Sequence, residues 1–431
     1  MMDIEGKLAQ RQREANPIRV ALIGAGQMGV EIVTTIGQMQ GIQIDVVVDL
    51  SEERARAGYA HARTSAPVVA AQNLDQAQAA LEAGKKVAST DYRLATRLPA
   101  IDAVIDATGS TEMGAVVSLD CFDHGKHVVM MNVECDVTIG PVLRRLAENA
   151  GVVYTLAAGD EPAAIIELYR FAHALGFEIV AVGKGKNNPL DIYATPKDLE
   201  QKARARNMSA NMLCEFVDGS KTAVEMAAVS TATGLMPDIR GMHGARATVA
   251  TLKDVFCPRK HGGVLNGTGV VDFAIGVHPG VFLVFTTDNT RLKDALIQRD
   301  MGPGPYYQLF RPYHLCSIEV PLTVAQAVLY RESSGHPGPR LVSECIAVAK
   351  RDLKAGAILD GIGGTCYRGS IEKAGIAAAE GLLPLGLAKG CVLKRAVSRD
   401  EPLRRDEVEF GAESVLLELR RLQDLRLSPC T

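Results

Sequence analysis

Lysines, asparagines and glycines crowd one short stretch near the middle of the 431-residue chain. This stretch, GKGKNNPL at positions 183–190, follows the apolar segment Phe177–Val182, which predicts a buried strand. A lysine with a lowered pKa can act as a general acid or base, and a charged lysine stabilises a developing alkoxide. We expect Lys184 and Lys186 to be catalytic, and Asn187 and Asn188 to orient substrate hydroxyls. A solvent-exposed basic loop is the alternative.

A second cluster at positions 238–246 contains two arginines and one histidine among several glycines. Arginine binds phosphate or carboxylate groups through two parallel hydrogen bonds, and histidine transfers protons near neutral pH. We therefore expect Arg240 and Arg246 to bind an anionic group of the substrate, and His243 to be catalytic. The stretch Arg259–Val264 has a similar composition, but it is more typical of a flexible turn.

Two neighbouring carboxylates, Asp160 and Glu161, stand directly before Pro162. Proline is well tolerated in the first turn of a helix, and a helix is predicted over Ala163–Leu175. We expect Asp160 and Glu161 to be catalytic, either by polarising a lysine or by recruiting a divalent cation. Because neighbouring side chains point apart, no metal site shared by the two is predicted.

A glycine-rich loop lies between a predicted strand, Ile18–Ile23, and a predicted helix, Val30–Gln38. The pattern G-x-G-x-x-G in this position is typical of a dinucleotide-binding loop. The first glycine allows the tight turn, the second allows a pyrophosphate to approach the backbone, and the third allows close packing of helix and strand. We expect cofactor contacts from Gly24, Gly26, Gln27, Met28 and Gly29. A plain glycine turn is the alternative.

An acid follows the second predicted strand, Ile42–Val48. Asp49 is placed to accept hydrogen bonds from the ribose hydroxyls of NAD, and its charge would repel the 2′-phosphate of NADP. Arg54 and Arg56 follow closely and would weaken that preference, so NADP stays an alternative to NAD. Asp49 could also cap the helix predicted over 51–57, and the two roles are compatible.

Strands and helices keep alternating up to residue 160. Further strands are predicted at Ile101–Ala107, Lys126–Met131 and Val152–Ala157, with helices at Glu112–Asp123 and Ile139–Asn149. This alternation predicts an α/β fold with a doubly wound parallel sheet of the Rossmann type. Ligands bind at the carboxyl ends of such strands. We therefore expect Thr108, Gly109 and Asn132 to contact the cofactor, with Glu134 and Asp160 on the same rim.

The rest of the chain predicts two further domains. Val270–Ile275 and Val281–Thr286 resemble strands of a second sheet, Glu319–Tyr330 predicts a returning helix, and Arg331–Arg340 resembles a linker. Short apolar stretches and a terminal helix at Glu413–Leu427 follow. We predict a dinucleotide-binding domain at 1–160, an α+β catalytic and oligomerisation domain at 161–335, and a β-rich domain at 340–431.

Composition excludes several classes of function. The formal net charge is −3, so no basic excess favours nucleic-acid binding. No apolar run approaches the ~20 residues that span a bilayer, and the polar N-terminus does not resemble a secretory signal. Nine dispersed cysteines without C-x-x-C or zinc-ligand spacing indicate reduced thiols, so we expect a cytoplasmic protein. Hydrolase and nucleotide-triphosphatase motifs are missing from the sequence.

The order of motifs resembles the homoserine dehydrogenase superfamily. The resemblance is carried by the glycine loop at 24–29, by GKHVV at 125–129 and by the helix entry at 159–162. Where that family has a catalytic lysine after the GKHVV strand, this chain has Val133, and the family's Asp-Ala-Arg-Lys run has no counterpart. Homoserine dehydrogenase activity is therefore the secondary expectation.

A closer resemblance, over nearly the whole chain, is to the branch with a C-terminal SAF domain that includes the deoxyxylulose 5-phosphate reductoisomerase-like (DRL) enzymes. The shared stretches are VVMMNVE at 128–134, AGDEP at 158–162, GKGKNNPL at 183–190, MHG-x-RA at 242–247 and RPYHL at 311–315. This resemblance implies a SAF-like domain near 342–410 and a homodimer or tetramer. Those enzymes use NADPH and carry Ser and Arg after the second strand, whereas Asp49 here favours NAD and another substrate.

We therefore expect an NAD(P)-dependent oxidoreductase acting on CH–OH groups. Its substrate would be a small polyhydroxylated carbonyl compound with a phosphate or carboxylate, and isomerisation could accompany the redox step, as in reductoisomerases or sugar-acid oxidoisomerases. From a different class, the chain could be a non-catalytic dinucleotide-binding regulator. The crowded GKGKNNPL stretch favours the enzyme.

Overall fold

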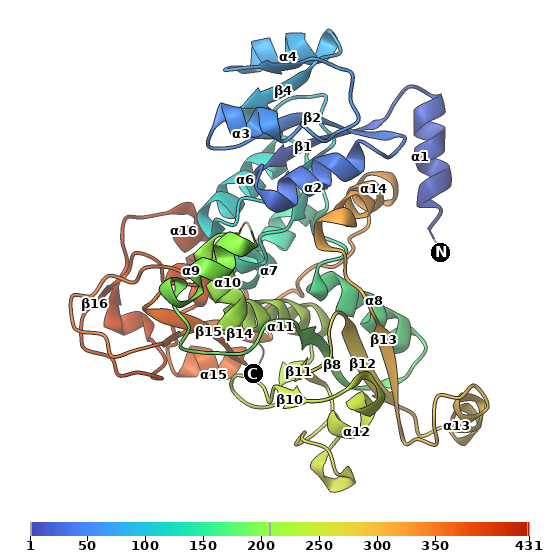
Figure 1. Cartoon of the computed structure of the whole chain (residues 1–431), viewed down its shortest axis with the longest axis vertical. Coiled ribbons are helices and arrows are strands. Elements are labelled where there is room, and N and C mark those ends of the chain that lie inside the picture. The colour runs from blue at the N-terminus through green and yellow to red at the C-terminus, as the bar shows by residue number, and fades with distance from the viewer. Residues whose placement is uncertain (1, 207, 429, 431) are drawn as a thin grey trace. The chain divides into compact units, whose positions relative to one another are not determined.

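The structure, a computed structural model, describes residues 2–206, 208–428 and 430. The chain forms two compact units, whose elements are labelled in Figure 1. Unit 1 comprises Met1–Ala163 and Leu315–His336, and unit 2 comprises Ala164–His314 and Pro337–Thr431. Each unit is therefore built from two separate stretches of sequence.

Unit 1 is built on a seven-stranded sheet in which every pair of neighbouring strands is parallel. The strands, in the spatial order β3-β4-β2-β1-β5-β6-β7, are β1 (Ile18–Ile23), β2 (Ile42–Val48), β3 (Val68–Ala70), β4 (Lys86–Ser89), β5 (Ala103–Asp106), β6 (His127–Met130) and β7 (Tyr154–Leu156). The chain runs outward from β1 on one side and then returns to β5 on the other. This arrangement confirms the expected Rossmann-type sheet and puts its switch point between β1 and β5.

The helices of unit 1 follow the strands as the alternating pattern predicts. They are α1 (Ile4–Arg13), α2 (Gln27–Ile36), α3 (Glu52–Ala57), α4 (Leu74–Glu82), α5 (Arg93–Thr96), α6 (Thr111–Asp123), α7 (Val133–Asn149) and the returning helix α14 (Val320–Tyr330). Branched side chains of β1 such as Val20 and Leu22 form a core with Ile32 of α2 and Val324 of α14. This core explains why residues 315–336 belong to unit 1.

Unit 2 is built on a mixed sheet in the order β10-β11-β8-β12-β13, with β9 also paired to β11. Its strands are β8 (Glu178–Lys186), β9 (Met236–Pro237), β10 (Ala245–Arg246), β11 (Val270–Ile275), β12 (Val281–Thr286) and β13 (Tyr306–Arg311). β8 lies at the centre, parallel to β11 and antiparallel to β12. Val180, Phe256 and Phe282 belong to the core of this sheet.

The helices of unit 2 include one that is buried almost all round. They are α8 (Glu161–Ala174, which starts at the end of unit 1), α9 (Pro196–Ala205), α10 (Ala210–Val217), α11 (Ser220–Thr233), α12 (Leu252–Val255), α13 (Thr290–Ile297), α15 (Ala374–Ala379) and α16 (Val415–Arg426). α11 packs against β11 on the central sheet and against β14 (Ser343–Ala349) and β15 (Tyr367–Lys373) of the C-terminal stretch (Figure 1). Its side chains are mostly small and buried, which suits a helix enclosed by two sheets.

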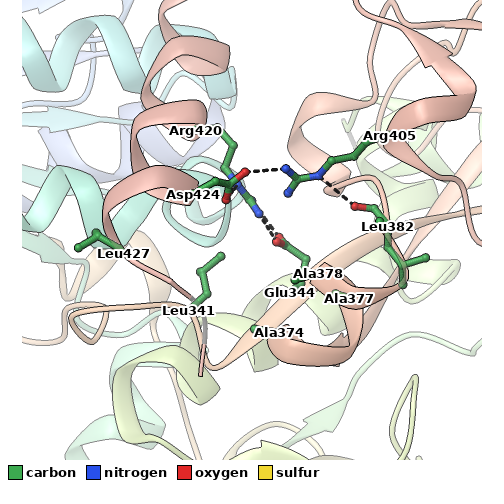
Figure 2. A pocket seen from close by; sticks show the side chains of 11 residues that line it. Leu341, Glu344, Ala374, Ala377, Ala378, Leu382, Arg405, Arg420, Asp424 and Leu427 are labelled. Carbon is green, nitrogen blue, oxygen red and sulfur yellow. Dashed lines mark hydrogen bonds and ion pairs between the residues drawn. The ribbon is translucent and has the colours of Figure 1, made fainter. Parts of the chain in front are cut away.

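The C-terminal stretch is rich in short strands. β14 pairs antiparallel with β15, and β16 (Val392–Leu393) pairs with β17 (Val408–Glu409). The fully buried guanidinium of Arg420 on α16 contacts Glu344 of β14 and donates to Asp424 (Nε–Oδ1 2.8 Å). Figure 2 shows these side chains lining a cavity of about 230 Å³, with Arg405 reaching the same Asp424.

The two-unit division differs from the three domains expected from the sequence. The contacts of α11 with β14 and β15 group residues 337–431 with the middle of the chain. The linker expected at Arg331–Arg340 contains the point where the chain passes from unit 1 to unit 2. Among the described residues, no helix is both long enough and apolar enough to cross a lipid bilayer.

Candidate active site

The glycine loop of unit 1 has the geometry of a dinucleotide cradle. Gly24 has φ +104°, and a Cβ there would lie 2.5 Å from the carbonyl oxygen of Ala107. A Cβ on Gly29 would lie 2.0 Å from the carbonyl oxygen of Gly24. Gly26 differs from both because it precedes α2 in an extended conformation and a Cβ there would meet nothing within 4 Å. The backbone packing therefore requires glycine at Gly24 and Gly29, whereas the space beside Gly26 is open.

Asp49 ends β2 next to this loop. Its Oδ2 accepts a hydrogen bond from the backbone N–H of Ala25 (2.8 Å), which ties the acid to the cradle. Its Oδ1 is buried, accepts no hydrogen bond from the described residues and lies 3.4 Å from Nε of Arg54. Arg56 is instead paired with Glu52 (2.9 Å). A buried carboxylate oxygen without a hydrogen-bond donor suits a ribose hydroxyl, so the residues present fit a dinucleotide.

The other expected cofactor residues differ in what they can offer. Gln27 and Met28 are exposed at the start of α2. Gly109 has φ +65° and open space around it, and Thr108 donates its N–H to Asp106 (3.0 Å). The fifth residue, Asn132, caps α7 by accepting from Cys135 N–H and donates to the carbonyl oxygen of Ser110 (2.7 Å). These bonds give the Asn132 side chain a role in joining α6 to α7.

The loop that carries Asp160 and Glu161 is held within unit 1 by the returning segment. Gly159 accepts a hydrogen bond from Cys316 N–H (2.9 Å), and Ala158 N–H donates to Thr323 (2.7 Å). Glu161 begins α8 and is buried, whereas Asp160 is half-buried. Glu134, in the first turn of α7, is buried as well. Glu134 follows the end of β6, and Asp160 and Glu161 follow the end of β7. These carboxylates therefore come after the carboxyl ends of two neighbouring strands, where Glu134 and Asp160 were expected.

Lys184 and Lys186 are not in a loop, because β8 continues through them to its end at Lys186. Both side chains are buried, with 7% and 6% of the residue exposed. A Cβ on Gly185 would lie 1.3 Å from the carbonyl oxygen of Val277, so one side of the strand is closed to side chains there. Since side chains alternate along a strand, the two lysines share the opposite side. The alternative of a solvent-exposed basic loop is wrong for these two residues.

The two lysines have different partners. Lys184 forms an ion pair with Glu225 of α11, which is itself 1% exposed. The Nζ of Lys186 donates to the carbonyl oxygen of Phe216, in the last turn of α10 (2.6 Å), and has no carboxylate partner among the described residues. Burial, followed by the charge of Lys184, lowers the pKa of Lys186 to about 8, while Glu225 and Asp218 act in the opposite direction. Lys186 is therefore the better proton carrier of the two.

The asparagines that follow lie at the surface. Asn187 is exposed, and Asn188 is half-buried and accepts a hydrogen bond from Arg206 Nη1 (3.1 Å). They come directly after the carboxyl end of β8, next to Lys186.

His243 belongs to a carboxylate–histidine pair. Its Nε2 lies 2.8 Å from Oδ2 of Asp238, and Asp238 also accepts from Asn266 N–H (2.8 Å). Burial opposes ionisation of Asp238, but these hydrogen bonds from Asn266 and His243 lower its pKa overall. The backbone N–H of His243 donates to Asp272 of β11 (3.0 Å), whose partner across the sheet is Gly183. The imidazole is therefore held in one orientation near β8.

The two arginines of this cluster have different surroundings. Arg240 is held by two carboxylates of the C-terminal stretch, Glu372 (2.6 Å) and Glu380 (2.7 Å). These ion pairs occupy the Nε and Nη2 donors that an anionic substrate would need. Arg246, at the end of β10, is exposed and has no ion-pair partner in the described part of the chain. Of the two, Arg246 is the one placed to bind an anion.

Sequence reasoning missed Glu225, which pairs with Lys184, and the Asp218–Lys350 pair. Glu225 is the one acid of helix α11, whose other residues are mostly small, and this is a signal that the sequence offers. Asp218 and Lys350 are buried and paired with each other (2.6 Å), although 132 positions of sequence separate them. Only the tertiary structure brings them together.

Comparison with known proteins finds one matching family model, over part of the chain. Residues 159–320 match a family model described as the catalytic domain of the oxidoreductase DRL. The matched segment contains β8, α11 and the His243 loop. No curated protein matches the chain.

Several solved structures resemble the chain at low sequence identity. A probable dehydrogenase from Thermotoga maritima is 13% identical, with 73% of this chain and 90% of that chain covered and a TM-score of 0.43. The 3-ketoreductase KijD10 from Actinomadura kijaniata, solved with TDP-benzene and NADP, is 13% identical, with 74% and 91% covered and a TM-score of 0.38. An oxidoreductase from Agrobacterium radiobacter, solved with NAD+, L-tartaric acid and magnesium, is 15% identical, with 40% and 44% covered and a TM-score of 0.27. The match over residues 159–320 confirms the expectation of an oxidoreductase enzyme.

Proposed function

We propose that this protein is an NAD(P)-dependent oxidoreductase that transfers hydride to or from a small polyhydroxylated carbonyl compound bearing a phosphate or carboxylate. The observation that carries the proposal is Lys186, a buried lysine without a carboxylate partner at the end of the central strand β8. It lies within the segment that matches an oxidoreductase catalytic domain. A lysine in such surroundings suits acid–base chemistry at a hydroxyl or carbonyl group.

The proposed cofactor is NAD, with NADP as the alternative. The open space at Gly26 leaves room for a pyrophosphate, and Oδ1 of Asp49, which accepts no hydrogen bond from the described residues, suits a ribose hydroxyl. The charge of Asp49 disfavours a 2′-phosphate, although Arg54 lies beside it. When bound, the dinucleotide supplies the hydride donor or acceptor.

The two lysines divide the proton chemistry. During oxidation, the neutral amine of Lys186 accepts the hydroxyl proton of the substrate, and the bound dinucleotide would accept the hydride. During reduction, the Lys186 ammonium returns a proton to the carbonyl oxygen. Lys184, which is ion-paired with Glu225, stabilises negative charge on that oxygen. The same pair would support a coupled isomerisation of a ketose.

The remaining assignments rest on position. Arg246 binds the anionic group of the substrate, because it is exposed and without an ion-pair partner among the described residues. His243, oriented by Asp238, is a second proton-transfer group. Asn187 and Asn188 orient hydroxyls, and Asp160 and Glu161 stay proposed as catalytic acids. A homo-oligomer and a SAF-like character of residues 340–431 also remain predictions.

The first experiment compares NADH and NADPH binding by nicotinamide fluorescence, followed by turnover of deoxyxylulose 5-phosphate and a panel of sugar acids. The variant Lys186→Met should bind NADH like the parent and lose at least about a hundredfold in turnover, because removal of a general acid–base group costs about 10²–10⁴-fold. Lys354→Met, at an exposed lysine of unit 2, is the matched control and should turn over normally.

Three results would change the proposal. Tighter binding of NADPH would show that Arg54 overrides Asp49. Full turnover by Lys186→Met would overturn the role of that lysine. Cofactor binding without turnover of any panel member would favour a regulator, and turnover of homoserine would favour the homoserine dehydrogenase alternative.

A further inference from the structure

Lys350 stands directly after β14, in the C-terminal stretch, and its ammonium group is buried with 3% of the residue exposed. Its Nζ lies 2.6 Å from Oδ2 of Asp218 and donates to the carbonyl oxygens of Ala194 (2.8 Å) and Gly364 (2.8 Å). An ammonium group has three N–H donors, so these three acceptors use all of them. A buried ammonium group is tolerated only when its donors are satisfied, so this set of partners stabilises the charged form of Lys350 in the folded protein.

Asp218 is paired with Lys350 and belongs to the segment that binds Lys186. Its Oδ1 accepts from Ser220 N–H (2.8 Å) at the start of α11, while its Oδ2 faces Lys350. Two residues earlier, the carbonyl oxygen of Phe216 accepts the hydrogen bond from Lys186. Asp218 is also one of the two acids whose charge acts on Lys186. Without Lys350, the Asp218 carboxylate would have the Lys186 ammonium as its nearby buried cation.

We propose that Lys350 is a positioning residue for Lys186: by holding the carboxylate of Asp218, it leaves the Lys186 amine without a carboxylate partner. Through this contact the C-terminal stretch completes the lysine site of the central sheet. The role of Lys350 depends on the proposed function, because it matters for catalysis only if Lys186 carries the proton.

The charges around Lys186 determine whether loss of Lys350 raises or lowers the pKa of Lys186. Its own strand contributes Lys184, α11 contributes Glu225, and the α10–α11 junction contributes Asp218. The residues paired with the two lysines on β11 and β12, namely Phe273, Ile275 and Val281, are uncharged. Asp218 is paired with Lys350, and Glu225 is paired with Lys184. Of these two acids, neither forms an ion pair with Lys186.

The test measures the titration of Lys186 without using activity. Trace acetylation by acetic anhydride between pH 6 and 11, read by peptide mass spectrometry, reports the fraction of neutral amine at each lysine. In the parent protein Lys186 should titrate near pH 8. In Lys350→Met, Asp218 loses its partner and pairs with Lys186, so the midpoint should rise by about one to three pH units. Lys354→Met should leave it unchanged.

Two further variants keep the test decisive if Lys350→Met does not fold. Asp218→Asn removes the acid and leaves Lys350 charged, so the Lys186 midpoint should fall. The double variant Asp218→Asn/Lys350→Met removes both charges, so the midpoint should return close to that of the parent. Opposite shifts in the single variants and cancellation in the double variant are the expected result.

An unchanged Lys186 midpoint in folded Lys350→Met, or equal shifts in the single and double variants, would overturn the role of Lys350. The outcome for the proposed function is separate. If the midpoints shift as expected but Lys186→Met turns over normally, then Lys350 controls Lys186 and Lys186 is not the proton carrier.

Discussion

At the scale of single residues, Gly26 is a glycine that the folded protein does not require but that cofactor binding is expected to require. Its backbone is extended, with φ −72°, and the space beside its Cα is empty within 4 Å. An alanine therefore fits the protein without strain and also reduces the entropy of the unfolded chain. The same methyl group would occupy the space into which a pyrophosphate must come.

We expect Gly26→Ala to fold with unchanged or slightly higher thermal stability, and to bind NADH at least about tenfold more weakly, a loss of about 1.4 kcal/mol. Fluorescence titration with NADH and thermal unfolding of the same sample measure the two effects. Gly24→Ala is the contrast, because its Cβ would lie 2.5 Å from the Ala107 carbonyl oxygen at φ +104°, and it should lose stability. Parent-like NADH affinity in Gly26→Ala would show that the cradle does not bind the pyrophosphate.

At the scale of elements, β8 depends on glycine in the interior of a strand. Gly185 donates its N–H to the carbonyl oxygen of Gly280 (2.9 Å), and the segment 277–280 passes directly over its Cα. Glycine normally weakens a strand, and it is found where another backbone approaches closely. The two glycines of GKGK therefore leave one side of the strand without side chains, so that another backbone can pack there, and the two lysines lie on the opposite side.

Gly185→Ala should destabilise the protein by about 3 kcal/mol or more, because its Cβ would lie 1.3 Å from a backbone oxygen and the strands would have to separate. Urea unfolding of this variant and of the parent measures the difference. The matched control is Gly267→Ala, since a Cβ there meets nothing within 4 Å and φ is not positive. Equal stability of the two variants would mean that β8 does not extend through Gly185.

At the scale of the whole molecule, unit 2 is assembled from two distant stretches of chain, and ion pairs, of which the Lys350–Asp218 pair is buried, join them. Lys350 reaches Asp218, and Glu372 reaches Arg240 (2.6 Å). Within the C-terminal stretch, Arg420 fastens the last helix, α16, to Glu344 of β14. A buried ion pair adds little net stability compared with an apolar pair, but removing one partner leaves an uncompensated buried charge.

Arg420→Met should therefore destabilise the protein by about 3–5 kcal/mol, because Glu344 stays buried without its partner. Thermal unfolding and limited proteolysis of the C-terminal helix measure this effect. The adjacent residue provides the control. Arg421 and Glu413 form a pair (2.8 Å) with side chains 54% and 65% exposed, so Arg421→Met should change stability by less than about 0.5 kcal/mol. Similar losses in both variants would mean that Arg420 is not the residue that fastens α16.

The fold of unit 1 follows from local sequence, and the reason is periodicity. A short apolar run followed by a turn defines a buried strand without reference to the rest of the chain. Two predicted strands coincide with β1 and β2, namely Ile18–Ile23 and Ile42–Val48. The same holds in unit 2, where the predicted strands Val270–Ile275 and Val281–Thr286 coincide with β11 and β12. The glycine loop and Asp49 could also be predicted, since they are adjacent in sequence to the strands that position them.

The lysine site could be predicted only in part. The sequence by itself determined that Lys184 and Lys186 follow an apolar strand, because that relation is local. The tertiary structure alone decided that the strand continues through them, since only the passing backbone at 277–280 requires glycine at Gly185. The tertiary structure also decided which of the two lysines has a carboxylate partner. Glu225 and the Lys350–Asp218 pair come from distant positions, and long-range charge pairing leaves no periodic signal in a sequence.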